Sequence, residues 1–308
     1  GAHTNASGCG NDTASERYMF GKFMADSVRY WAEEYHLDGF RFDLMGLHDL
    51  SAMQKVEAAI HEVNPEALIY GEGWNMGSTM DGSPQANQGN IGKIAKTNNA
   101  IGTIAVFNDV IRDGLKGSVF QTTSRGYISG EGPSNAGKVR FGISGGSLSG
   151  FGWKVPDSMV INYMSAHDNH SLWDKLALSN AADSPETRAE MNRLGAAVLM
   201  ISRGTPFFQA GEEMLRSKDG DENSYKSSDA INNIRWDTLT PDSEAYRTME
   251  YYRCLIAMRR AYGAFRYGEV SFSDLGNGRM EIRFGHSALA VINPTGDSFP
   301  YSLEEEWN

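Results

Sequence analysis

Charged side chains stand inside one short apolar segment of the chain. The segment GFRFD (39–43) has Phe40 and Phe42 at alternate positions, and Arg41 and Asp43 at the positions between and after them. Strand side chains alternate between faces, so a strand here places Arg41 and Asp43 on the same face. A buried charge without a partner is costly, and two charges this close form either a structural ion pair or part of an active-site wall. The segment alone leaves both interpretations open.

Two later apolar segments also end in polar residues. The segment YGEGW places Glu72 between two glycines, and SMVINYMSAHDN ends in His167, Asp168 and Asn169. Taken alone, Glu72 is typical of a surface acid and His167 of a core histidine. In barrel enzymes, however, the carboxyl ends of parallel strands converge on one mouth. Two carboxylates with different pKa values suit glycoside hydrolysis, in which one attacks the anomeric carbon and the other protonates the leaving oxygen.

Strands and helices alternate along most of the chain. Apolar runs predict strands over 38–43, 67–72, 104–109, 159–167 and 205–209. Segments with helical character lie between them, and a last helix is predicted over 244–262. Strands separated by helices predict a parallel sheet of the α/β class. A closed (β/α)8 barrel needs eight strands, so five indicate either an open sheet or part of a barrel.

The first predicted helix has a stripe of large apolar side chains. The segments 13–16 and 51–54 have capping-box spacing and predict where the first two helices begin. Six apolar residues of the first helix recur at helical spacing: Phe20, Phe23, Met24, Val28, Trp31 and Tyr35. Such a stripe is typical of a helix face that packs into a core.

The last part of the chain differs from the rest. Residues 265–308 contain short β-like runs separated by Gly, Asn and Ser. The sequence therefore predicts two domains, an α/β domain over 1–264 and the beginning of a β-rich domain over 265–308.

Composition excludes several classes of partner. The net charge is −11, which argues against a nucleic-acid backbone, and no apolar run approaches the roughly 18 residues of a membrane span. A neutral, hydroxyl-rich substrate remains compatible. The first residue is Gly rather than Met, so the compartment stays open, either secreted or cytoplasmic.

Cysteine and acidic residues give weak signals for a disulfide or a metal. Cys9 and Cys254 are expected to be two thiols rather than one bridge. Asp219, Asp221 and Glu222 form an acidic loop with the oxygen ligands that Ca²⁺ prefers, but a solvated loop is the favoured interpretation. We expect no organic cofactor and no metal site.

Several segments together resemble one enzyme family. DGFRFDLMG, YGEGW and MSAHDNHSLWD resemble three of the four signature regions of the α-amylase clan of glycoside hydrolases. These segments, together with NASGCGNDTASER and GTPFFQAGEEMLRSKDGDENSYKSSDAINNIRWD, are most similar to the type I pullulanases, which are starch-debranching enzymes. The resemblance extends over residues 5–265, and the segments occur in the family's order.

The resemblance implies a role for each candidate residue. Asp43 would be the nucleophile, Glu72 the general acid and then the base, and Asp168 the residue that stabilises the transition state. Arg41 would hold Asp43 ionised and oriented. Three residues would bind substrate, by hydrogen bonding, stacking or contact with the sugar: His167, Trp74 and Asn169.

The resemblance also implies a fold and a function. The fold would be a partial TIM (β/α)8 barrel, strands four to eight, followed by the start of a C-terminal β-sandwich domain. The function would be retaining hydrolysis of α-1,6 branch links in pullulan, starch or glycogen, with the missing N-terminal half of the enzyme as a partner. Two alternatives are an α-1,4-acting amylase, neopullulanase or branching enzyme of the same clan, and a truncated fragment without activity.

Overall fold

The computed structural model of the chain describes residues 4–76, 84–95 and 104–303, with 93–95 described by their backbone alone. These residues belong to two compact units. The first unit comprises residues up to 111, 140–163 and 199–208, and the second comprises 112–139, 164–198 and the residues from 209 onward. The two units are described separately below.

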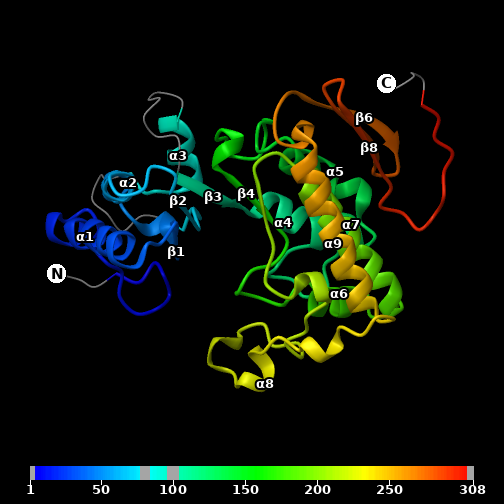
Figure 1. Cartoon of the computed structure of the whole chain (residues 1–308), viewed down its shortest axis with the longest axis horizontal. Coiled ribbons are helices and arrows are strands. Elements are labelled where there is room, and N and C mark those ends of the chain that lie inside the picture. Colours follow the sequence, from blue (N-terminus) through cyan, green and yellow to red (C-terminus); the bar gives the residue numbers. More distant parts are fainter. Residues whose placement is uncertain (1–3, 77–83, 96–103, 304–308) are drawn as a thin grey trace. The chain divides into compact units, whose positions relative to one another are not determined.

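The first unit contains a five-stranded sheet in which every neighbouring pair is parallel (Figure 1). Its strands are β1 (Gly39–Phe42), β2 (Leu68–Gly71), β3 (Ile104–Asn108), β4 (Val160–Tyr163) and β5 (Thr205–Phe207). They lie side by side in chain order, as consecutive strands of a (β/α) barrel do. The predicted strands and their parallel pairing are confirmed.

One predicted strand end is wrong. β4 ends at Tyr163, four residues before the predicted end at 167, so His167 and Asp168 lie on the following loop. Both neighbouring strands stop at the same level, since Asn162 pairs with Asn108 of β3 and Tyr163 with Phe207 of β5. Without further ladder partners, the apolar pattern beyond Tyr163 does not extend the strand.

The two faces of the sheet have different chemistry. One face carries an aromatic cluster, in which the Phe107 ring lies 5.6 Å from that of Tyr70, 4.8 Å from that of Tyr163 and 5.3 Å from that of Phe207. On the other face, the Asn108 amide donates to Asn162 Oδ1 at 2.9 Å, and both residues are fully buried. Each buried amide is satisfied there, as burial of a polar group requires.

Helices of the first unit begin at residues other than those predicted. α1 (Tyr18–Tyr35) has Arg17 as its N-cap, so the capping box predicted at 13–16 is wrong. Ser15 instead accepts the backbone N–H of Asp49 at 2.7 Å. Asp49 is in turn the N-cap of α2 (Leu50–His61), and its side chain accepts from Ala52 N, so the box predicted at 51–54 is also wrong. The third helix is α3 (Gln88–Ala95).

The aromatic stripe of α1 is not core, and this prediction is wrong. The buried residues of α1 are Gly21, Met24, Val28 and Ala32, whereas Phe23, Trp31 and Tyr35 are 63%, 43% and 56% exposed. α1 packs on α2 through the smaller side chains. A Cβ on Gly21 would lie 3.8 Å from Ala52 Cβ, so the helices approach closely there, and the aromatic residues occupy other faces of α1.

The second unit contains helices, loops and a small sheet (Figure 1). The remaining helices are α4 (Asp109–Lys116), α5 (Gly132–Ile143), α6 (Leu172–Ser179), α7 (Pro185–Ile201), α8 (Asp229–Asn232) and α9 (Glu244–Ala261). Of these, α4, α5 and α7 include residues of both units. An antiparallel sheet follows, formed by β6 (Val270–Gly276), β7 (Arg279–Phe284) and β8 (Ala288–Ile292). The β-rich character of the C-terminal segment is confirmed for residues 265–303, and the domain boundary at 264 stays a prediction.

Two further observations concern membrane spans and cysteines. None of the helices within 4–76, 84–95 and 104–303 is long and apolar enough to cross a membrane. Cys9 and Cys254 are exposed free thiols, as predicted.

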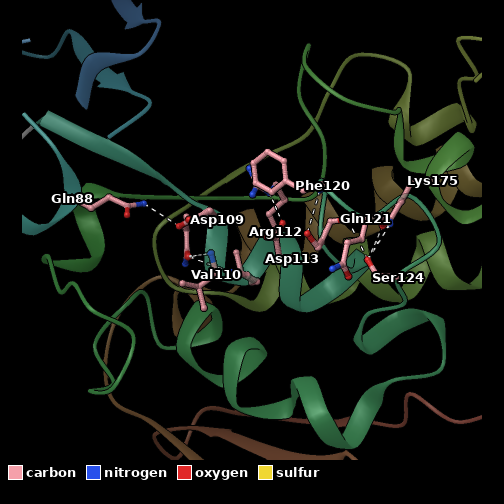
Figure 2. Close-up of polar contacts among 12 residues, drawn as sticks. Gln88, Asp109, Val110, Arg112, Asp113, Phe120, Gln121, Ser124 and Lys175 are labelled. Atoms are coloured by element: carbon pink, nitrogen blue, oxygen red, sulfur yellow. Dashed lines mark hydrogen bonds and ion pairs between the residues drawn. The ribbon is translucent and has the colours of Figure 1, made fainter. Parts of the chain in front are cut away.

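A buried lysine fastens one loop of the second unit to α6. Lys175 is 2% exposed, and its ammonium donates to the backbone oxygens of Ser118, Gln121 and Thr122 at 3.1, 2.6 and 2.9 Å. It also donates to Ser124 Oγ at 3.3 Å, and Figure 2 shows the side chain pointing at Gln121 and Ser124. Burial lowers the pKa of Lys175 to about 8.

This burial predicts a pH-dependent stability. An unfolded lysine has a pKa of about 10.4, so the folded state binds fewer protons between pH 8 and 10 and the free energy of unfolding rises with pH there. Across this range, the free energy of unfolding of the wild type should rise by about 1–3 kcal/mol more than that of Lys175→Met. Urea unfolding at several pH values measures it. For the control Lys226→Met, at an exposed lysine, the free energy of unfolding should change with pH as it does in the wild type. If the free energies of unfolding of the wild type and Lys175→Met differ by the same amount at every pH, the prediction is contradicted.

Candidate active site

Two of the candidate acids follow neighbouring strand ends. Phe42 and Gly71 are register partners at the ends of β1 and β2, and Asp43 and Glu72 come directly after them. The backbone N–H of Leu44 donates to Glu72 Oε2 at 2.9 Å, which ties the turn after β1 to the acid after β2. The expected convergence of these two strand ends is therefore present.

Arg41 contacts both acids. Its Nη1 forms an ion pair with Asp43 Oδ1, and its Nη2 lies 2.8 Å from Glu72 Oε1. The guanidinium carbon lies 5.9 Å from the centre of the Phe107 ring, within the range of a cation–π contact. One cation thus offsets the repulsion between two neighbouring carboxylates.

The two acids differ in their exposure. The side chain of Asp43 is 68% exposed and that of Glu72 is 10% exposed. A carboxylate that reaches solvent can approach an incoming atom, whereas a nearly buried one is held by its neighbours. Two carboxyl groups in such different environments can take different chemical roles.

Close backbone packing fixes the surroundings of Glu72. A Cβ on Gly71 would lie 2.6 Å from Phe42 O, and one on Gly73 would lie 2.8 Å from Val106 Cγ1. A Cβ on Gly46 would lie 2.1 Å from the backbone oxygen of Trp74. The backbone therefore packs closely around the YGEGW segment. The Trp74 side chain is half-buried, and its stacking role stays a prediction.

The other candidate residues lie in the second unit. His167 and Asp168 have side chains 56% and 65% exposed, and His167 Nε2 lies 3.6 Å from Asp168 Oδ1. Asn169 has a φ of 64°, in the left-handed region that few residues other than Gly adopt. The structure thus groups Arg41, Asp43 and Glu72 in one unit and His167, Asp168 and Asn169 in the other. That the two groups form one site stays a prediction.

The acidic loop engages its carboxylates with neighbouring side chains. Asp219 accepts from Arg235 at 2.7 Å and Asp221 from Ser227 at 2.5 Å, and these hydrogen bonds hold the pKa of each carboxyl below its usual value. In the described ranges, no group of three or more His, Cys, Asp and Glu residues is placed to hold a metal ion.

Sequence reasoning missed the residues that support the His167 loop. Ser165 donates a hydrogen bond to Glu212, and the ammonium of Lys218 donates to the backbone oxygen of His167 at 3.3 Å. Glu212 and Lys218 lie 47 and 51 residues from their partners along the chain, so local patterns could not reveal them. The sequence shows only that Glu212 and Lys218 are charged; the structure shows that both are buried.

Comparison with known proteins gives consistent matches. A pullulanase of Bacillus subtilis (strain 168) is 39% identical over 272 residues, which cover 86% of this chain and 36% of the relative. The chain is homologous to the pullulanases. The predicted resemblance to this family of glycoside hydrolases is thereby confirmed. No protein-family model matches the chain.

Solved structures agree with the sequence comparison. The pullulanase from Bacillus acidopullulyticus superimposes with a TM-score of 0.82 at 36% identity, covering 92% of this chain and 34% of that one. A Paenibacillus barengoltzii pullulanase, in complex with maltohexaose and alpha-cyclodextrin, gives 0.82 at 35% identity, covering 91% of this chain and 43% of that one. The chain spans about a third of the length of these pullulanases. Its parallel sheet is therefore a half-barrel of the pullulanase fold.

The packing of Gly46 against Trp74 gives a test of the site's geometry. Gly46→Ala should lower the free energy of unfolding by about 1–3 kcal/mol, because the added Cβ meets a backbone oxygen that cannot move away. Urea unfolding measures the loss. Gly89→Ala is the matched control, since its Cβ makes an ordinary 3.6 Å contact in a helix. Equal stability of the two variants would show that the backbone around Trp74 gives way.

Proposed function

We propose that this chain forms part of the catalytic centre of a retaining, pullulanase-type glycoside hydrolase that cleaves α-1,6 links in glucans. The observation that carries the proposal is the contact of one guanidinium, that of Arg41, with Asp43 and Glu72 at adjacent strand ends. A retaining glycosidase needs its two carboxyl groups about 5–5.5 Å apart, and a shared cation keeps two carboxyl groups close.

The two acids divide the chemistry. The exposed Asp43 attacks the anomeric carbon, and a covalent glycosyl–enzyme intermediate forms as the glycosidic bond breaks. Glu72 donates a proton to the leaving oxygen and then takes a proton from the water that hydrolyses the intermediate. Arg41 orients both carboxylates through its two terminal nitrogens.

The loop after β4 supplies sugar contacts in this proposal. Asp168 stabilises the positive charge that develops on the sugar ring, while His167 and Asn169 bind hydroxyl groups. The exposure of the His167 and Asp168 side chains supports a role in contact with a ligand. Trp74 gives one glucose ring a stacking surface. The substrate would be an α-glucan, the class named for the Paenibacillus barengoltzii complex.

We assign β1–β5 to strands four to eight of a (β/α)8 barrel, and β6–β8 to the start of a C-terminal β-sandwich. In this assignment, the earlier barrel units pack on the exposed aromatic face of α1 and beside the outer edge of β1. Their polypeptide, the N-terminal half of such an enzyme, is the partner that we propose. Without it the open half-barrel is expected to lack activity.

Substitution of the two acids tests the proposed function. The assay joins this chain to the preceding part of the Bacillus subtilis pullulanase and follows maltotriose release from pullulan. Asp43→Asn should lower the rate at least 1,000-fold, because no other group forms the intermediate. Glu72→Gln should do the same for pullulan but much less for a glycosyl fluoride, whose leaving group needs no proton.

Asp26→Asn, at an exposed acid on α1, is the matched control and should keep full activity. An Asp43→Asn variant that keeps more than a tenth of the wild-type rate would refute the assignment of Asp43 as the nucleophile. Release of products other than maltotriose, by cleavage at α-1,4 links, would support an α-1,4-acting enzyme of the same clan instead.

The exposed face of α1 gives a separate test of the assignment to strands four to eight. In the isolated chain, Phe23→Ser and Trp31→Ser together should reduce self-association and binding of a hydrophobic dye, because they remove exposed apolar area. The Tm should change little. Val28→Ser, at a buried position of the same helix, should lower the Tm instead. A large loss of Tm in the double variant would show that this face is already covered.

A further inference from the structure

We propose that Lys218 is a positioning residue for the loop that carries His167 and Asp168, and that it acts by holding the backbone of His167. The proposal rests on the role proposed above for that loop. Lys218 would touch no substrate, since the residue is only 5% exposed.

The ammonium of Lys218 bridges two segments. It donates to the backbone oxygen of His167 at 3.3 Å and to Ser224 Oγ at 2.7 Å. Hydrogen bonds from a charged donor are stronger than those between neutral groups. A hydrogen bond to the backbone of His167 limits the positions that the His167 and Asp168 side chains can take.

Lys218 is itself fastened to α6, which follows the loop directly. Its backbone N–H donates to Asp174 Oδ2 at 2.8 Å, and the hydroxyl of Ser217 donates to Asp174 Oδ1 at 2.5 Å. Asp174 is buried in the first turn of α6, where its own N–H donates to the N-cap Ser171. The ammonium therefore has a rigid base from which to hold His167.

The loop has a second anchor at its start. Ser165, 1% exposed, donates to Glu212, whose other carboxylate oxygen accepts from Tyr252 at 3.1 Å. Lys218 then holds the middle of the loop, and the N-cap Ser171 holds its end. Between these points Asn169 has a left-handed backbone conformation, which is uncommon for residues other than Gly and persists where the surroundings support it.

The cost of burying an ammonium indicates that Lys218 has a specific role. Burial of a charge is unfavourable unless it is paired and hydrogen-bonded. Burial and the positive charge of Arg216 lower the pKa of Lys218, and the carboxylates of Asp221, Asp168 and Asp174 offset part of that cost. Asp168 is one of the residues that the loop presents, so the same cation that holds the loop also attracts its carboxylate.

Hydrogen exchange of the chain without glucan tests the positioning role. In Lys218→Met, which keeps the length of the side chain and removes the ammonium, amides 165–171 should exchange at least tenfold faster. The matched control is Lys226→Met, an exposed lysine of the same segment with the same change of charge. Wild-type exchange at 165–171 in Lys218→Met would overturn the proposal.

A spectroscopic readout separates positioning from general support. The Cε1–Hε1 resonance of His167, assigned with His167→Asn, should move in Lys218→Met, and its response to maltotriose should require at least fivefold more ligand. The maltotriose measurement uses the chain joined to the preceding part of the Bacillus subtilis pullulanase, as in the activity assay. If the His167 resonance of that joined enzyme does not respond to maltotriose, the proposed function fails, whereas the exchange result still decides the positioning role. An unmoved resonance in Lys218→Met would count against positioning.

A second variant applies if Lys218→Met does not fold. Asp174→Asn keeps the shape of the side chain and weakens its hold on the backbone N–H of Lys218. Amides 217–224 and 165–171 should then exchange faster together, while the loop 118–124 stays as in the wild type. Faster exchange at 217–224 alone would overturn the proposal.

Discussion

The candidate site depends on the contact of the Arg41 guanidinium with Asp43 and Glu72. Two carboxylates about 5 Å apart repel by about 3 kcal/mol at an effective dielectric constant of 20, and a cation in contact with both removes most of that cost. Parallel pairing of β1 and β2 brings Asp43 and Glu72 to the same edge. The Phe107 ring and the turn at Leu44 then limit where the guanidinium and the Glu72 carboxylate can lie.

Support of the second group of candidates has a different physical basis. Asp43 and Glu72 follow directly from paired strands, so the sheet itself positions them. His167 and Asp168 lie four and five residues beyond the end of β4, where no ladder holds the backbone. Buried side chains from distant segments, Glu212 and Lys218, make hydrogen bonds to that loop instead. A loop so held combines exposed side chains with a fixed backbone.

How much of this the sequence could predict depends on the range of the interaction. The five strands and the adjacency of Asp43 and Glu72 follow from apolar runs and from the geometry of parallel sheets, and the structure confirms both. The predicted capping boxes were wrong because Ser15 accepts the distant backbone N–H of Asp49, and because Asp49, two residues before the predicted box, caps α2. The aromatic stripe of α1 was wrong because periodicity gives a face but not the partner that covers it.

The acidic loop shows why composition alone left two interpretations open. Clustered carboxylates are typical both of cation sites and of segments that bond to neighbouring side chains, and only their partners distinguish the two. Here Asp219 bonds to Arg235 and Asp221 to Ser227, so the oxygens that a cation would need are engaged. In the same segment, Lys218 is a buried lysine. Replacing a buried charge by an apolar side chain is often neutral or stabilising, so a buried ammonium is consistent with a specific structural role.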